Sequence, residues 1–78
     1  MEVEELLSVL RLLAESSALT AHTASHRAGG DVTLLTRAAA EADEHARSAI
    51  GTSDFPLWSS VALACAQAIA GEVRPPRT

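Results

Sequence analysis

The sequence contains no lysine and no tyrosine, and Phe55 and Trp58 are its only aromatic residues. Valine, isoleucine and threonine are also scarce, which argues against an all-β domain. Alanine, the strongest helix former, occurs 16 times, so we predict an all-α fold. Hydrophobic residues make up 47% of the chain, which excludes an intrinsically disordered protein. A length of 78 residues leaves room for one domain.

Positive charge is scarce as well. The six basic residues are all arginine, they are scattered along the chain, and the formal net charge is −4. Binding to nucleic acid or to an anionic membrane surface normally needs a concentrated basic patch, so we expect neither partner. The longest uncharged run, residues 55–71, is shorter than the roughly 20 apolar residues of a transmembrane helix and contains Pro56.

Cys65 is the only cysteine, so no disulfide can form within the chain. A single thiol suits a reducing compartment, and the acidic N-terminal residues differ from the basic start of a secretory signal. We therefore expect a cytoplasmic protein. Cys65 lies among alanines with no charged residue nearby, so we interpret it as a buried core residue and not as a nucleophile.

The helical spacing of apolar residues and the positions of the glycines predict a small three-helix antiparallel bundle. The helices cover about 2–28, 32–50 and 55–70 within a domain of residues 1–72. A flexible Pro/Arg tail follows at 73–78. Gly29 and Gly30 provide the end of the first helix, and Asp31 is placed to cap the second. Gly51 and the polar residues after it repeat this arrangement before the third helix. The apolar stripe of the second helix is mostly alanine, which predicts close approach of another helix.

The first predicted helix is the least regular of the three. Its first half has leucines at helical spacing, whereas its second half is rich in serine and threonine, which are poor helix formers. The sequence leaves open whether the helix bends or ends near Ser16 and Ser17.

The third predicted helix is apolar on nearly all sides. We predict that eight residues form the core or an interface. They comprise the strongest face of this helix, the aromatic residues at its start and two leucines of the first helix: Leu57, Trp58, Val61, Cys65, Ile69, Phe55, Leu10 and Leu13. Its opposite side carries Leu63, Ala66 and Ala70. A helix that is apolar all round is normally buried all round, and two partner helices cannot cover it completely. We therefore expect it to pack in the groove of a second subunit or to be covered by another protein.

The small size of the chain favours the same expectation. Domains below about 80 residues seldom gain more than 3–5 kcal/mol from one core, and they commonly add disulfides, metals or partners. A disulfide within the chain is excluded here. We expect a homodimer that is formed through the third helix, because two subunits would then pool their apolar faces.

The titratable residues provide one candidate metal site. His22 and His26 are four residues apart, as are Glu41 and His45, and this spacing places both members of a pair on one helix face. Both pairs also fit ordinary polar helix faces, and motifs such as Cys-x-x-Cys are absent. We interpret these four residues as surface residues, and we expect no metal, no other cofactor and no enzymatic activity.

These features favour a non-catalytic interaction or assembly module that self-associates or packs on a partner protein through its helices. The alternative is a small regulatory or inhibitory protein, such as a transcription accessory factor or an antitoxin-like partner. An acidic surface would suit that role, because it can compete for a basic site on another protein.

Overall fold

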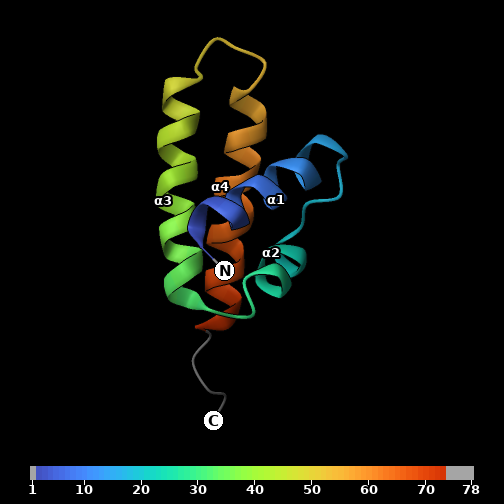
Figure 1. The fold of residues 1–78 in the computed structure, drawn as a ribbon, viewed down its shortest axis with the longest axis vertical. Coiled ribbons are helices and arrows are strands. Elements are labelled where there is room, and N and C mark those ends of the chain that lie inside the picture. Colours follow the sequence, from blue (N-terminus) through green and yellow to red (C-terminus); the bar gives the residue numbers. More distant parts are fainter. Residues whose placement is uncertain (1, 74–78) are drawn as a thin grey trace.

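The structure is a computed structural model that describes residues 2–73, and over this range all regular secondary structure is helical, as predicted. The helices number four in this range and not the predicted three: α1 (Val3–Glu15), α2 (Ala21–Arg27), α3 (Val32–Ser48) and α4 (Phe55–Glu72). The helices α3 and α4 lie side by side and run in opposite directions, and α1 crosses in front of them (Figure 1). The short helix α2 packs on the C-terminal half of α4 (Figure 1). The predicted tail beyond Val73 lies outside the described residues.

The first predicted helix is divided because α1 ends in a Schellman motif. Ser17 has a left-handed conformation, with φ of 59°. The N–H of Ser17 donates to the carbonyl of Ala14 at 3.1 Å, and the N–H of Ala18 donates to the carbonyl of Leu13 at 2.8 Å. This pair of hydrogen bonds satisfies carbonyls that the end of a helix leaves without partners. The prediction of one helix over residues 2–28 is therefore wrong.

Side-chain caps start the next two helices. Thr20 Oγ1 accepts a hydrogen bond from the N–H of Thr23 at 3.0 Å, at the beginning of α2. Asp31 Oδ1 accepts one from the N–H of Leu34 at 3.1 Å, at the beginning of α3, so the predicted cap is confirmed. The two glycines before Asp31 have φ of 64° and 73°, which residues with a side chain rarely adopt.

The start of α4 uses its capping residue differently. Asp54 occupies the N-cap position, but its carboxylate makes no capping hydrogen bond to the helix. The carboxylate instead accepts a hydrogen bond from the guanidinium of Arg11 in α1. Pro56 lies in the first turn of the helix, as expected from the sequence. The helix continues to Glu72, two residues beyond its predicted end. Within residues 2–73, no helix combines the length and apolarity needed to cross a bilayer.

The core lies where α1 and α2 pack on the pair α3 and α4. It consists of leucines and small residues: Leu6, Leu7, Leu10, Ala24, Ala28, Leu35, Ala38, Ala42, Val61, Ala64, Cys65 and Ala68. The predicted alanine stripe is confirmed, since Ala38, Ala42 and Ala46 of α3 are buried. Side chains this small let α3 and α4 approach closely along their whole length.

We predict that Ser17→Gly raises the free energy of unfolding by about 0.5–1 kcal/mol, because glycine adopts a left-handed conformation without the steric cost that serine bears. Ser17 is exposed, so no packing is lost. Urea unfolding followed by circular dichroism measures the change.

Ser16→Gly is the matched control for this prediction. Ser16 has φ of −92°, and its hydroxyl donates to the carbonyls of Leu12 and Leu13, so this change lowers stability. Equal effects of the two substitutions would contradict the role assigned to Ser17.

Candidate interaction surface

The helix α4 is buried on one side and open on the other. Its buried side consists of Val61, Ala64, Cys65 and Ala68. On the opposite side Leu63 is 59% exposed, and Ala66 and Ala70 are exposed as well. The three neighbouring helices therefore cover only part of its circumference, and apolar side chains remain in contact with solvent.

A line of six residues runs along α4 to its C-cap, and we call it the outer stripe: Phe55, Ser59, Ala62, Ala66, Ile69 and Val73. Phe55, Ala66 and Val73 are exposed, and the other three are half-buried. Ala62 and Ile69 also pack against the core, so the stripe lies along the edge of the open side. The steps between successive members alternate between four and three residues, as the a and d positions of a coiled-coil seam do. No residue from 55 to 71 is charged. The outer stripe is thus an uncharged line along the helix, with the spacing that another helix requires.

The eight residues predicted as core or interface differ in how far they are buried. Leu10, Val61 and Cys65 are fully buried. The half-buried ones are Leu13, Leu57, Trp58 and Ile69. Phe55 is 39% exposed. Of these eight residues, Phe55 and Ile69 belong to the outer stripe.

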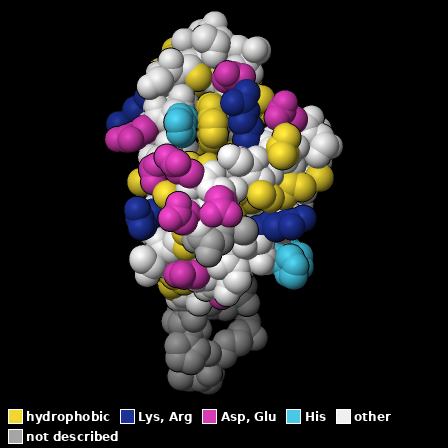
Figure 2. All heavy atoms as spheres, in the orientation of Figure 1, with side chains coloured by type: hydrophobic (Ala, Val, Ile, Leu, Met, Phe, Trp, Pro, Cys, Tyr) yellow, Lys and Arg dark blue, Asp and Glu magenta, His cyan; other side chains and the backbone are white. Residues whose placement is uncertain are grey.

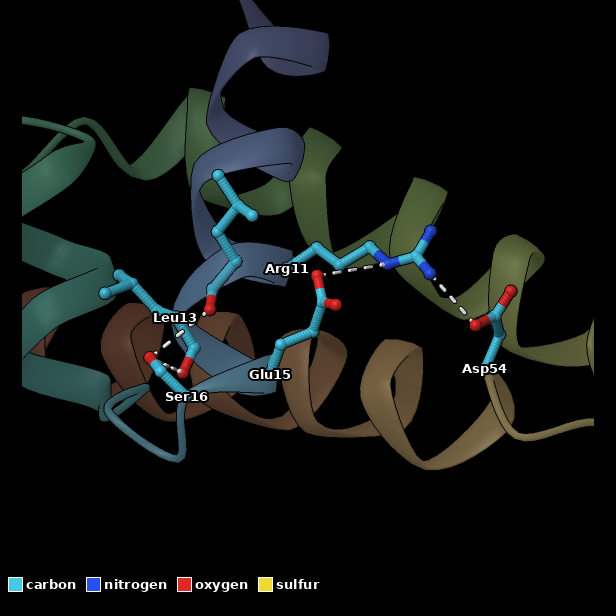
Figure 3. Close-up of polar contacts among 6 residues, drawn as sticks. Arg11, Leu13, Glu15, Ser16 and Asp54 are labelled. Atoms are coloured by element: carbon cyan, nitrogen blue, oxygen red, sulfur yellow. Dashed lines mark hydrogen bonds and ion pairs between the residues drawn. The ribbon is translucent and has the colours of Figure 1, made fainter.

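Trp58 connects α4 to both α1 and α3. His45 stacks on its ring with the two centroids 4.4 Å apart and the planes 20° apart, and the guanidinium of Arg11 lies 5.4 Å from the ring centroid. A histidine, a hydrophobic and a basic side chain accordingly lie side by side on the face shown in Figure 2. Arg11 Nη2 also donates a hydrogen bond to Asp54 Oδ1 at 2.9 Å, and Arg11 Nε lies 4.0 Å from Glu15 Oε2 (Figure 3). These contacts cover part of the Trp58 side chain, which is half-buried.

Sequence reasoning missed this cluster. His45 was predicted as a surface residue and is exposed, but its stacking on Trp58 was not predicted, nor was the position of Arg11 over the same ring. Arg11, His45 and Trp58 come from three different helices, and no local spacing relates them. The only available signal was the position of Trp58 at the start of a helix, where its large ring needs neighbours from other elements.

Two shallow hollows lie between α1 and α3, and both are lined by Glu4 and Glu41. One has a volume of about 470 Å³ and extends to Glu2 and Arg37. The other has about 250 Å³ and extends to Trp58. Acidic side chains gather on this face, which Figure 2 shows in magenta. The α1–α3 face therefore concentrates negative charge.

The candidate metal ligands are not assembled into a site. His22 and His26 lie on α2, where both are exposed, whereas Glu41 and His45 lie on α3. Over the part of the chain that the structure describes, no group of three or more His, Cys, Asp or Glu side chains is placed to hold a metal ion.

Cys65 is fully buried in the core. Loss of solvent around the thiol raises its pKa from 9.0 to about 11. The thiolate is the reactive form of cysteine, and it is disfavoured here at neutral pH. The environment of Cys65 is therefore that of a core residue.

Comparisons of the chain with protein-family models, with curated proteins and with solved structures find no match. The candidate interaction surface accordingly rests on the exposure, spacing and charge of the chain's own residues.

We predict that the wild-type protein loses stability relative to Cys65→Ala as the pH rises from about 9 towards 11. The buried thiol keeps its proton up to a pKa of about 11, whereas the thiol of the unfolded chain ionises near 9.0, so alkaline pH favours the unfolded state. The loss at pH 10 is roughly 1 kcal/mol.

Urea unfolding of both proteins between pH 7 and pH 10.5 measures this difference. Other titrating groups are common to the two proteins and cancel in the comparison. A difference that stays constant with pH would show that solvent reaches the thiol in the folded state.

Proposed function

We propose that this chain is a non-catalytic helical interaction module that self-associates through the outer stripe of α4. The observation that carries the proposal is the stripe itself, whose residues are exposed or half-buried, carry no charge and are spaced like a coiled-coil seam. Its neighbour Leu63 widens the apolar surface to one flank. Surfaces of this kind are typical of contacts with another helix.

The size of the protein supports a partner for this surface. Burying a large apolar side chain completely contributes about 1.5–3 kcal/mol. Phe55, Leu63 and Val73 are each between 39% and 59% exposed, so covering them would contribute a substantial part of that amount at each site. A core of this size alone supplies only about 3–5 kcal/mol, and self-association would therefore be a major part of the total stability.

The distribution of charge favours a second copy as the partner. Each chain has a net charge of −4, so two copies repel each other if their acidic faces meet. The α1–α3 face carries Glu2, Glu4 and Glu41 around its hollows, whereas the outer stripe has no charge. Approach through α4 therefore avoids the repulsion. A basic partner would gain nothing from the outer stripe and would be attracted to the acidic face instead.

The second candidate is a small regulatory or inhibitory protein, and the acidic α1–α3 face supports it. In that case one basic protein would bind over the hollows that Glu4 and Glu41 line. This function predicts a dominant heterologous partner, whose binding weakens steeply with salt. Self-association through the apolar outer stripe depends little on salt.

We predict that Ala66→Glu weakens self-association at least 10-fold, because it places a charge in the middle of the outer stripe, where a partner would have to desolvate it. Sedimentation equilibrium between 1 and 200 µM measures the association, and circular dichroism checks that the helices are retained. Ala66 is exposed within each chain, so the substitution leaves the fold of the chain intact.

Gln67→Glu is the matched control, since Gln67 is the exposed next residue and lies outside the stripe. It is expected to associate like the wild type. A wild-type protein that remains monomeric up to 200 µM would refute self-association. Dimers that tolerate Ala66→Glu would place the interface elsewhere.

A further inference from the structure

We infer that α2 belongs to a flap that opens as a unit while α1, α3 and α4 stay packed, and that the contact between Ser25 and Glu72 is its latch. The flap comprises residues 18–28, which lie between Ser17 and Gly29. It packs against the C-terminal half of α4 (Figure 1). Opening of the flap is independent of the proposed self-association.

The flap contributes little to the core. The helix α2 has seven residues, and isolated helices shorter than about 12 residues are marginal in water. Ala24 and Ala28 are the buried residues of the flap, and Leu19 packs against the core from a half-buried position. The helix α1, in contrast, buries three leucines. Because the free energy of burial grows with the apolar area removed from water, two alanines hold the flap less firmly than three leucines hold α1.

The packing between α2 and α4 is incomplete. A hollow of about 240 Å³ lies between the two helices. Its lining comes from both of them: Ala21, His22, Ser25, Gln67, Ala68, Gly71 and Glu72. A water molecule takes up about 30 Å³ in the liquid, so the hollow has room for several. The flap therefore separates from a surface that water already reaches in part, and not from a close-packed seam.

One side-chain hydrogen bond joins the flap to α4. The hydroxyl of Ser25 donates to Oε2 of Glu72, and within residues 2–73 no other side-chain hydrogen bond or ion pair links α2 with another helix. Oε1 of the same carboxylate lies 3.6 Å from the position that a Cβ at Gly30 would take. The C-terminal end of a helix disfavours a carboxylate, so the position of Glu72 suits the flap better than it suits α4.

Both ends of the flap have backbone that can rotate. Gly29 and Gly30 have φ of 64° and 73°, and glycine adopts left-handed and right-handed conformations about equally well. A Cβ at Gly29 would meet nothing within 4 Å, so this residue turns in open space. At the other end, Ser17 has φ of 59°, and the steric cost of this conformation is relieved when the segment after it is released.

Opening of the flap changes the surface of α4. With the flap closed, Ala68 is buried and lines the hollow next to α2. Its neighbours Ala66 and Ala70 are exposed already. When the flap opens, Ala68 becomes more accessible and joins them. The flap thus controls how much apolar surface the C-terminal half of α4 presents to solvent.

Hydrogen exchange of single amides, followed by NMR, tests the opening. Ala24 in the flap and Ala42 in α3 are both fully buried, and the N–H of Ala24 donates to the carbonyl of Thr20 at 3.0 Å. After correction for neighbouring residues, we expect Ala24 and Ala28 to be protected at least about 10-fold less than Ala42. Their exchange should also depend little on urea, because local opening exposes little surface. Equal protection with equal urea dependence would overturn the inference.

Glu72→Ala tests the latch. The loss of one hydrogen bond is expected to speed exchange at Ala24 and Ala28 at least about 3-fold. Exchange at Ala42 should not become faster, because alanine is the better helix former and a carboxylate leaves the end of α4. A merely structural effect on α4 would therefore slow exchange.

Glu44→Ala is the matched control, since Glu44 is an exposed glutamate near the C-terminal end of α3. Exchange at Ala24 and Ala28 is expected to stay within about 1.5-fold of the wild type in this variant, because no contact of the flap is changed. If Glu72→Ala changes the exchange of the flap no more than Glu44→Ala does, the inference is wrong.

Discussion

The close contact between α3 and α4 positions the rest of the molecule. Ala38, Ala42 and Ala46 present almost no side chain, so the backbone of α4 lies near that of α3 along both helices. The leucines of α1 then cover one side of this pair, and α2 covers the C-terminal half of α4. With the neighbours so placed, the other side of α4 stays open. The outer stripe is thus a direct consequence of where three helices can pack on a fourth.

The contacts of Trp58 determine the character of the open surface. Tryptophan is the residue most enriched at the centres of protein interfaces. Here His45 of α3 stacks on the ring and the guanidinium of Arg11 of α1 lies over it, so both helices contact the start of α4. The remaining apolar surface consists of one phenylalanine with aliphatic and small side chains. The proposed association through this surface would depend on close approach of the helices and on filling the space between them, more than on a single anchoring side chain.

Several local features of the fold could be predicted because short-range chemistry decides them. Asp31 caps α3 through a hydrogen bond to an N–H three residues away, and the two glycines before it supply left-handed backbone. The alanine stripe of α3 follows directly from helical periodicity. The division of the first predicted helix was only indicated, by its serines and threonines. Its position depends on Ser17 adopting a left-handed conformation, which serine seldom does without the hydrogen bonds of the Schellman motif.

The sequence by itself determined the helical fold class, the turn and capping residues before α3, and the excess of apolar surface on the last helix. These follow from composition, local hydrogen bonding and periodicity, which act over a few residues. Only the tertiary structure decided which side of α4 is covered, and that Trp58 is held by Arg11 and His45. Residues from three helices meet there, and the packing of whole helices, rather than any spacing along the chain, brings them together.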